Sequence, residues 1–372
     1  MTTASSAVDA AARYRRIRMT AKVSFNTPAF LGDAFQQARW RTPPFKWLLR
    51  RWWRIVHAPG VDYDVARLRS DELELFGSAS DDSDGGSGQS QVRLSLSDWS
   101  SGTMKNWNDT GMPQVKSGKY GVSAALYLGF GPLDRDKDKG VKLASKNRTV
   151  PATAIDPACE AVNLRLTAPQ DSALELAKTV QLLTWFGSAG SRARNGWGSL
   201  DISEDNLLTV EALLDGRGTG ILDSVDRPLE DCLKLDWPHA IGRDNRGALV
   251  WTTSPQSDWK KIIGALATLK KDLLSLLSED KSSPGQRHVF NYPVTKKELR
   301  EWNNARLANQ VCFKVARLGK EQLCGIVYHL PCATPKSVTT NDLRELESRT
   351  WRTVHQQLDA SKMLSRIGKG DS

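Results

Sequence analysis

RWRTPPFKWLLRRWWRIVH, at residues 39–57, is the stretch that decides the fold of this chain. Thr42 is the predicted N-cap of a helix, and Pro43 and Pro44 suit the first helical turn, where the amide hydrogen that proline lacks has no acceptor. At about 100° per residue, one stripe of this helix is apolar: Phe45, Leu48, Leu49, Trp52 and Val56. The other side and its margin carry cations and one indole: Lys46, Trp47, Arg50, Arg51, Arg54 and His57.

The cationic side of this helix suits a nucleic acid. Guanidinium groups fork onto phosphate oxygens and stay charged, and indole rings offer stacking surfaces for unpaired bases. An ordinary amphipathic surface helix has the same pattern, so both interpretations stay open at this point.

Length and composition favour a globular protein of two domains. The chain has 372 residues, of which 40% are hydrophobic and 25% charged, which excludes a disordered chain. No apolar run approaches about 18 residues, so we expect no membrane-spanning helix and no membrane partner. The N-terminal stretch lacks the apolar core of a secretory signal, and we expect a cytoplasmic protein.

The positive charge is concentrated at the N-terminal end. The net charge is +10, and residues 1–58 hold eleven lysines and arginines against two aspartates, so this segment carries nine of the ten charges. The segment starts with a predicted basic arm at residues 1–20. This distribution predicts a polyanion-binding region, although a basic segment can also serve an acidic protein partner.

The cysteines do not indicate a disulfide framework, because five of them are spread along the chain. Cys312, Cys324, His329 and Cys332 could be assembled into a zinc site, but their spacing lacks a paired C-x2-C knuckle. We therefore predict buried core cysteines and no metal or other cofactor.

The first half of the chain alternates strands and helices. Residues 21–25 and 91–99 have the period of strands, and residues 121–132 are also strand-like. A strand is predicted at residues 161–168 and a helix at residues 171–186.

The pattern restarts in the second half. A helix is predicted at residues 258–278, a hairpin of strands at residues 310–318 and 323–331, and a last helix at residues 340–358. This order predicts an α+β fold of tandem ferredoxin-like, RRM-related domains. The predicted domains are residues 21–205, with inserted loops at 80–90, 98–118 and 134–150, and residues 206–372.

A second motif, GSAGSRARNGWGSL, occupies residues 187–200. Its glycines, Gly196 and Gly198 among them, allow positive φ, and exposed amides in such a loop form an anion nest. Arg192 and Arg194 add charge, and Trp197 is a candidate stacking face. A plain helix-to-strand turn is the other interpretation. The motif is not a Walker loop, because no G-K-[ST] follows.

Together these stretches resemble the RAMP superfamily of CRISPR proteins. More narrowly, the chain is similar to the first-numbered RAMP subunits of type III-B Cmr effector complexes. The matching stretches are NTPAFLGD (26–33), RWRTPPFKWLLRRWWR (39–54), ELFGSA (74–79), VRLSL (92–96), LYLGFGP (126–132), GSAGSRARNGWGSL (187–200), RLANQVCFKV (306–315) and TWRTVHQQLD (350–359). The chain departs from the family at Ser188, where a second glycine is common, and at Asn195, where a basic residue is common.

The resemblance implies a place in an RNA-guided effector complex for antiviral defence. It implies assembly with other Cmr subunits around a guide (CRISPR) RNA, a grip on the 3′ part of the guide and on its duplex with target RNA, and no nuclease activity of this subunit. The residues expected to bind the RNA backbone, independently of sequence, are Lys46, Arg50, Arg51, Arg54, Arg192, Arg194, Gly196 and Gly198.

Two other functions stay open. Some RAMP proteins are metal-independent endoribonucleases that process guide RNA, and His57 is the only histidine placed to act as an acid or base. The competing interpretation of His57 is a solvated histidine at a helix end, where the helix dipole favours its charge. The third function is a scaffold that contacts only protein partners.

Overall fold

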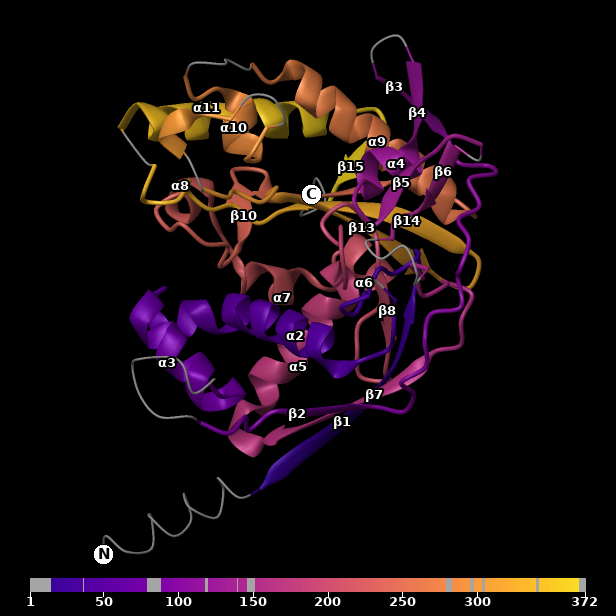
Figure 1. The fold of residues 1–372 in the computed structure, drawn as a ribbon. Coiled ribbons are helices and arrows are strands. Elements are labelled where there is room, and N and C mark those ends of the chain that lie inside the picture. The colour runs from indigo at the N-terminus through magenta and orange to yellow at the C-terminus, as the bar shows by residue number, and fades with distance from the viewer. Residues whose placement is uncertain are drawn as a thin grey trace, which may run out of the picture.

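Two βαββαβ units follow one another in the computed structural model of the chain (Figure 1). The residues that the structure describes are 15–35, 37–78, 88–117, 120–138, 140–145, 151–278, 283–294, 298–302, 305–338 and 341–367. Residues 1–14 of the predicted basic arm and residues 80–87 of the first predicted loop lie outside them. Residues 16–20, which were assigned to the arm, form the first half of strand β1.

The first unit is built around an antiparallel sheet with the strand order β2-β7-β1-β8. Two helices connect its strands in the ferredoxin-like manner. In chain order its elements are β1 (Arg16–Phe25), α2 (Thr42–His57), β2 (Arg93–Leu96), β7 (Val162–Pro169), α5 (Ala173–Phe186) and β8 (Leu200–Ser203).

The second unit repeats this topology, with the strand order β13-β14-β12-β15. Its elements are β12 (Val250–Thr253), α9 (Trp259–Leu276), β13 (Val311–Leu318), β14 (Gln322–His329), α11 (Asn341–Ala360) and β15 (Leu364–Arg366). The α+β prediction of tandem ferredoxin-like domains is therefore confirmed. The predicted division at residues 205 and 206 stays a prediction; β8 ends just before it.

Further elements are inserted into and between the units. A 3-10 turn η1 (Ala58–Val61) and helix α3 (Val65–Phe76) follow α2. Between β2 and β7 lie β3 (Gln114–Ser117), β4 (Tyr120–Ser123), α4 (Ala124–Gly129), β5 (Leu133–Asp136) and β6 (Gly140–Leu143), and η2 (Gln170–Ser172) precedes α5. Between the units lie α6 (Val210–Leu214), α7 (Thr219–Asp223), β9 (Asp226–Pro228), α8 (Leu229–Cys232), β10 (Ile241–Asp244) and β11 (Gly247–Ala248). The second unit also contains α10 (Gln286–Phe290) and η3 (Arg300–Trp302).

One strand prediction is wrong. Residues 121–132 form the end of β4 and then helix α4. Ala124, Ala125 and Leu128 are buried in the core shared with α9, so packing against that helix overrides the strand-like pattern. The predicted loop at 98–118 contains β3, which pairs with β4 just beyond the loop, and the predicted loop at 134–150 contains most of the short hairpin β5-β6.

Helix α2 is buried more completely than a surface helix. The predicted apolar stripe is confirmed for Phe45, Leu48, Leu49 and Trp52, whereas Val56 is only half-buried. Trp53 and Ile55 are also buried. Figure 1 shows the reason, because α2 and α5 lie between the sheet of the first unit and strands β13 and β14 of the second.

The contact between the two units involves these helices and the glycine-rich loop, which is the motif at residues 187–200. The ring of Trp52 is stacked on Phe186 with the centroids 5.6 Å apart, and lies 6.0 Å from the ring of Tyr328 in β14. The Tyr328 hydroxyl donates to the carbonyl of Phe186 at 2.9 Å. On the neighbouring strand, the amide of Phe313 donates to the carbonyl of Arg194 at 2.9 Å, so the loop is paired with β13.

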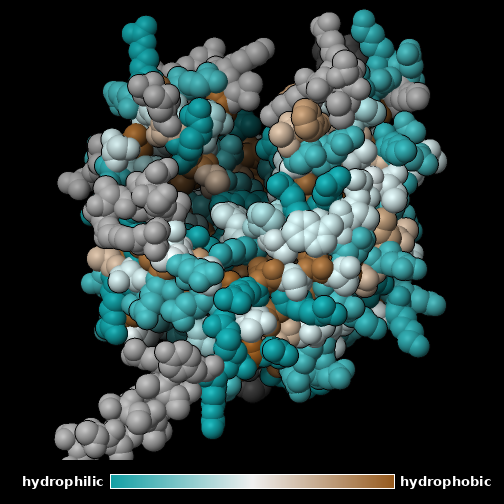
Figure 2. All heavy atoms as spheres, turned by 60° about the horizontal axis from the view of Figure 1, so that its bottom comes forward, coloured by the Kyte–Doolittle hydropathy of each residue, from teal (hydrophilic) through white to brown (hydrophobic). Residues whose placement is uncertain are grey.

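The surface is that of a protein with its apolar side chains packed inside. On the face shown in Figure 2, hydrophobic residues reach the surface in small patches among hydrophilic ones. Among the described residues, no helix combines the length and the apolar character that crossing a membrane requires.

The glycine-rich loop depends on Gly198 for its path. Its φ is +59°, and a Cβ built on it would lie 1.9 Å from the carbonyl oxygen of Ala189. We predict that Gly198→Ala lowers the free energy of unfolding by about 3 kcal/mol or more, measured by denaturant titration. Gly60→Ala is the matched control, since no heavy atom lies within 4 Å of a Cβ there. Equal stability of the two variants would contradict this account.

Candidate nucleic-acid interface

A groove of about 840 Å³ lies beside the N-terminal half of α2. Its other walls are β2, the glycine-rich loop and the segment that joins α8 to β10. Six cationic side chains line it, and none of the described lining residues is acidic. These cations are Lys46, Arg50, Arg51, Arg54, Arg93 and Arg194. The structure thus brings together five of the six cations that the sequence predicts to bind RNA.

Helical geometry places the α2 cations along this groove. Lys46, Arg50 and Arg54 recur at four-residue intervals and therefore form one row on the helix, opposite the buried stripe. The guanidinium of Arg51 lies 5.7 Å from the ring centre of Trp47, whose side chain is 59% exposed. The groove therefore offers an exposed indole next to its cations.

Two arginines of this row already have an anionic partner. The carboxylate of Glu72, on α3, is buried and accepts hydrogen bonds from Arg50 Nε at 2.6 Å and from both Nε and Nη2 of Arg54. Their charge is thus partly compensated within the protein, which the sequence pattern did not reveal. Burial and then the charge of Arg50 lower the pKa of neighbouring Lys46.

Arg51 and Arg194, in contrast, have no carboxylate partner in the described groove. Arg194 is half-buried and donates through Nη1 to the carbonyl of Asn309 at 2.8 Å. Burial lowers the pKa of Arg194; the buried thiol of Cys312 opposes this shift, and the nearby charge of Arg51 adds to it. Arg51 Nη2 is buried without a hydrogen-bond partner among the described residues. This pair of like charges, in a groove without acidic lining residues, is the strongest reason to expect a bound anion.

The remaining predicted residues lie apart from the groove. Arg192 is exposed and lines a separate cavity. Gly196 and Gly198 are buried, and the carbonyl of Gly196 accepts from the Thr27 hydroxyl at 2.8 Å. Their contact with RNA stays a prediction.

The interpretation of Trp197 as a stacking face is wrong. Its side chain is fully buried, with ring centroids 5.4 Å from Phe30, 5.6 Å from Trp107 and 5.9 Å from Trp259. The indole supports the loop from inside the aromatic core, so it has no free face for a base.

Sequence reasoning missed the far walls of the groove. Arg93, on β2, and Trp237 with Pro238, before β10, also line it. Strand alternation around Val92 and Leu94 could have indicated that Arg93 points away from the core. Trp237 carries no such local signal, because its place depends on the packing of the segment between the two units.

His57 lies at the end of α2, as the competing interpretation had it, but its side chain is half-buried and paired with carboxylates rather than solvated. Nδ1 lies 2.8 Å from Glu175 Oε1 and Nε2 lies 2.8 Å from Asp71 Oδ2, and its ring stacks on Trp53. Burial lowers the pKa of His57, but the hydrogen bonds and charges of Asp71 and Glu175 outweigh burial and raise the pKa above its ordinary value of 6.5. The imidazolium therefore joins α2, α3 and α5.

The residues of the zinc hypothesis are core residues. Cys312, Cys324, Cys332 and His329 are all buried, as predicted for the cysteines. His329 Nδ1 lies 2.9 Å from His355 Nε2, rather than close to the thiols in a shared site. No group of three or more His, Cys, Asp or Glu suited to a metal ion occurs among the described residues.

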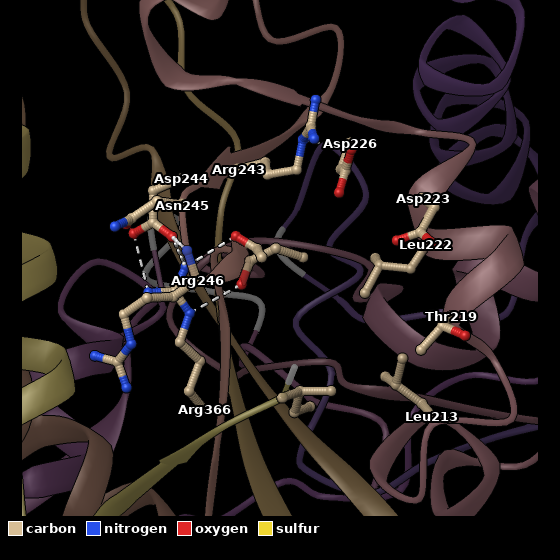
Figure 3. Close-up of a pocket in the computed structure, with 13 residues that line it drawn as sticks. Leu213, Thr219, Leu222, Asp223, Asp226, Arg243, Asp244, Asn245, Arg246 and Arg366 are labelled. Carbon is tan, nitrogen blue, oxygen red and sulfur yellow. Dashed lines mark hydrogen bonds and ion pairs between the residues drawn. The ribbon is translucent and has the colours of Figure 1, made fainter. Parts of the chain in front are cut away.

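Another cavity, of about 960 Å³, differs from the groove in its charge (Figure 3). Its arginines face aspartates: Arg243 lies 3.1 Å from Asp226, Arg366 lies 2.6 Å from Asp244, and Arg246 lies 2.8 Å from Asp359. Because its cations are compensated, this cavity offers a polyanion no surplus of positive charge.

We predict that Glu72→Gln lowers the free energy of unfolding by about 2 kcal/mol, because it replaces the buried carboxylate shared by two guanidinium groups with a neutral amide, whose NH2 group cannot accept from them. Denaturant titration measures the change. Glu74→Gln, an exposed position on the same helix, is the control and should change stability by less than about 0.5 kcal/mol. An equal effect of both substitutions would show that the Glu72 ion pairs do not stabilise the fold.

The raised pKa of His57 predicts the direction of a pH effect. Its stabilising contribution is complete below the ordinary pKa of 6.5 and is lost as the pH rises through the higher folded-state pKa. His57→Gln should therefore cost more stability at about pH 5.5 than at about pH 9. Urea titrations of both proteins at both pH values test this, and a pH-independent difference would contradict it.

Comparison with known proteins finds likenesses in structure alone. No protein-family model and no curated protein matches the chain in sequence. The apo crystal structure of Cmr1 from Pyrococcus furiosus is similar, with a TM-score of 0.45, 15% identity, and coverage of 95% of this chain and 99% of that chain.

A chain in the cryo-EM structure of the type III-B Cmr-beta bound to cognate target RNA and AMPPnP is similar, with a TM-score of 0.48 and 11% identity. A chain in the cryo-EM structure of the type III-B Cmr-beta bound to cognate target RNA has a TM-score of 0.46 and 10% identity. Each match covers 91% of this chain and 100% of that chain.

Proposed function

We propose that the chain is a non-catalytic RNA-binding subunit of a type III-B CRISPR (Cmr) effector complex. Its groove grips the backbone of the guide RNA, at the 3′ part and in the duplex with target RNA. Other Cmr subunits supply the remaining contacts and the cleavage of RNA. The complex serves antiviral defence.

The observation that carries this proposal is the charge of the groove. Six cationic side chains converge there from α2, β2 and the glycine-rich loop, without an acidic residue among the described lining residues. Arg51 and Arg194 lie close enough for their charges to interact. A chain of phosphates supplies several negative charges at regular spacing, which is what such a row of cations binds best.

The assignment to a Cmr complex rests on the order of the sequence motifs. The stretches 39–54 and 187–200 both contribute walls of the groove. The same two stretches, with 26–33 and 126–132, line a separate cavity. The tandem ferredoxin-like topology is the fold that the resemblance implies.

Two observations favour a non-catalytic role. The titratable side chains described around the groove are lysine and arginine, so a general base and a general acid for 2′-hydroxyl chemistry would have to come from elsewhere. His57, the candidate of the ribonuclease hypothesis, has both ring nitrogens engaged by carboxylates. It holds three helices together and is not among the described residues that line the groove.

The mechanism we propose is sequence-independent. Guanidinium and ammonium groups neutralise phosphates, and the exposed ring of Trp47 stacks on an unpaired base or covers the end of a duplex. Base pairing between guide and target then supplies the sequence specificity, and the protein reads only the backbone and its shape.

We predict that the double variant Lys46→Gln/Arg51→Gln weakens binding to RNA of any sequence alike. These two cations are better targets than Arg50 and Arg54, whose removal would also strand the buried Glu72. The slope of log affinity against log salt should fall by about 0.7 for each phosphate of a single strand that the variant no longer neutralises. Fluorescence anisotropy with unrelated oligonucleotides at several salt concentrations measures both effects.

Two further variants complete this test. Lys105→Gln/Arg69→Gln removes the same charge from exposed positions outside the groove and should leave affinity nearly unchanged. Glu72→Gln should bind RNA more tightly than the wild type, because it frees two guanidinium groups. Loss of binding to some sequences only, or equal loss in both double variants, would contradict backbone binding in the groove.

Assembly is tested by purifying the tagged chain from its native cells and by identifying the bound RNA and proteins. Guide RNAs with repeat-derived ends, together with other Cmr subunits, are the expected result. Protein partners without RNA would favour the scaffold, and shortening of a guide precursor by the purified chain alone would favour the ribonuclease.

A further inference from the structure

A second cavity lies on the other side of the first turn of α2. It has a volume of about 570 Å³ and is lined by Arg41 and Arg192 among others. Thr42 and Pro43 line the groove, whereas Arg41 and Pro44 line this cavity, so one helical turn separates the two. As in the groove, none of the described lining residues is acidic.

The two arginines of this cavity are held by backbone carbonyls. Arg41 Nη2 donates to the carbonyl of Gly32 at 2.7 Å, and its Nε is buried without a partner among the described residues. Arg192 Nε donates to the carbonyl of Phe130 at 2.6 Å. Neutral partners fix the position of both guanidinium groups and leave their charge uncompensated.

The backbone of Arg192 is in an unusual conformation. Its φ is +59°, in the left-handed region that residues with a side chain rarely adopt. The surrounding loop maintains this conformation, because the amide of Asn195 donates to the carbonyl of Arg192 at 2.8 Å. Strain of this kind persists at sites where a side chain must point in one direction.

Glycines keep the space beside the guanidinium open. A Cβ on Gly131 would lie 3.4 Å from Arg192 Nη2, and one on Gly190 would lie 2.8 Å from the carbonyl oxygen of Phe30. The cavity wall is therefore bare backbone at these positions. A ligand can approach Arg192 more closely than side chains there would allow.

A third cation lies behind the cavity. Lys270, on α9, donates through Nζ to Asn195 Oδ1 at 2.9 Å. Burial, and to a lesser extent the charge of Arg192, lower the pKa of Lys270 to about 8, while Cys312 opposes the shift. An anion beside Arg192 would relieve this repulsion.

We propose that this cavity is a second phosphate site, reached by a single strand of RNA that leaves the groove and crosses the first turn of α2. The strand places a backbone phosphate between Arg41 and Arg192. The inference rests on the proposed function of the groove. A single strand fits better than a duplex, because its flexible backbone can bend around a helical turn between two adjoining sites.

The test is the dependence of affinity on RNA length. Wild-type protein should bind an oligouridine of about 16 nucleotides more tightly than one of about 4 nucleotides, because only the longer strand reaches both sites. Arg192→Gln should remove most of this gain, about five- to tenfold, and lower the salt slope for the longer RNA by about 0.7. Arg192→Lys should keep the slope, since it keeps the charge.

Controls separate failure of this inference from failure of the proposed function. Arg69→Gln should show the wild-type gain, and thermal melting checks that each variant is folded. If Arg192→Gln keeps the full gain while Lys46→Gln/Arg51→Gln binds RNA weakly, the second site is wrong and the groove stands. If wild-type protein binds neither RNA, both are wrong. Oligoglutamate binding that depends on Arg192, with RNA binding that does not, would assign the cavity to an acidic protein partner and overturn the inference.

Discussion

The buried ammonium of Lys314 is the interaction on which the rest of this structure depends. It extends from β13 in the second unit and donates to the carbonyls of Leu183 and Thr184, at the end of α5 in the first unit. The Leu183 carbonyl also accepts from the amide of the C-cap residue Gly187 at 2.8 Å, so Lys314 adds to the cap of α5 and joins the two units. Burial lowers the pKa of Lys314 to about 7, which measures how fully the contact is removed from water.

The path of the glycine-rich loop follows from this contact. Lys314 holds the end of α5 beside β13. The glycine-rich loop then pairs with β13 through the Phe313 amide, and the Ser199 hydroxyl accepts from the Val315 amide at 2.9 Å. Arg194 is thereby placed beneath the groove, next to Arg51, while Arg192 is turned toward the other side of α2. The distribution of charge on the surface is therefore set by packing between the units.

The cations of α2 are not equivalent, although the sequence presents them as one row. Arg50 and Arg54 share the carboxylate of Glu72, and their role includes holding α3 against α2. Lys46, Arg51 and Arg194 have no carboxylate partner in the described groove and carry the surplus charge. A binding surface made in this way combines stability with affinity, because one set of cations is compensated within the protein and the other is left for the ligand.

Periodicity was sufficient to predict the apolar stripe of α2 and the repeated order of strands and helices, since both depend on local patterns along the chain. Periodicity failed where long-range contacts determine the position of a side chain. Trp197 is buried by aromatic residues from distant segments, and His57 is held by carboxylates from two other helices. Trp237 reaches the groove only through the segment between the units. No pattern around these residues contains that information.

The central claim is that RNA lies in the groove between α2 and the segment before β10. Ultraviolet crosslinking of guide RNA to the purified protein, followed by mass spectrometry of the crosslinked peptides, tests it most directly. We expect crosslinks in the peptides that contain Trp47 and Trp237, which both line the groove. Crosslinks confined to the charge-balanced cavity around Arg243 and Arg366, with none beside α2, would contradict the account.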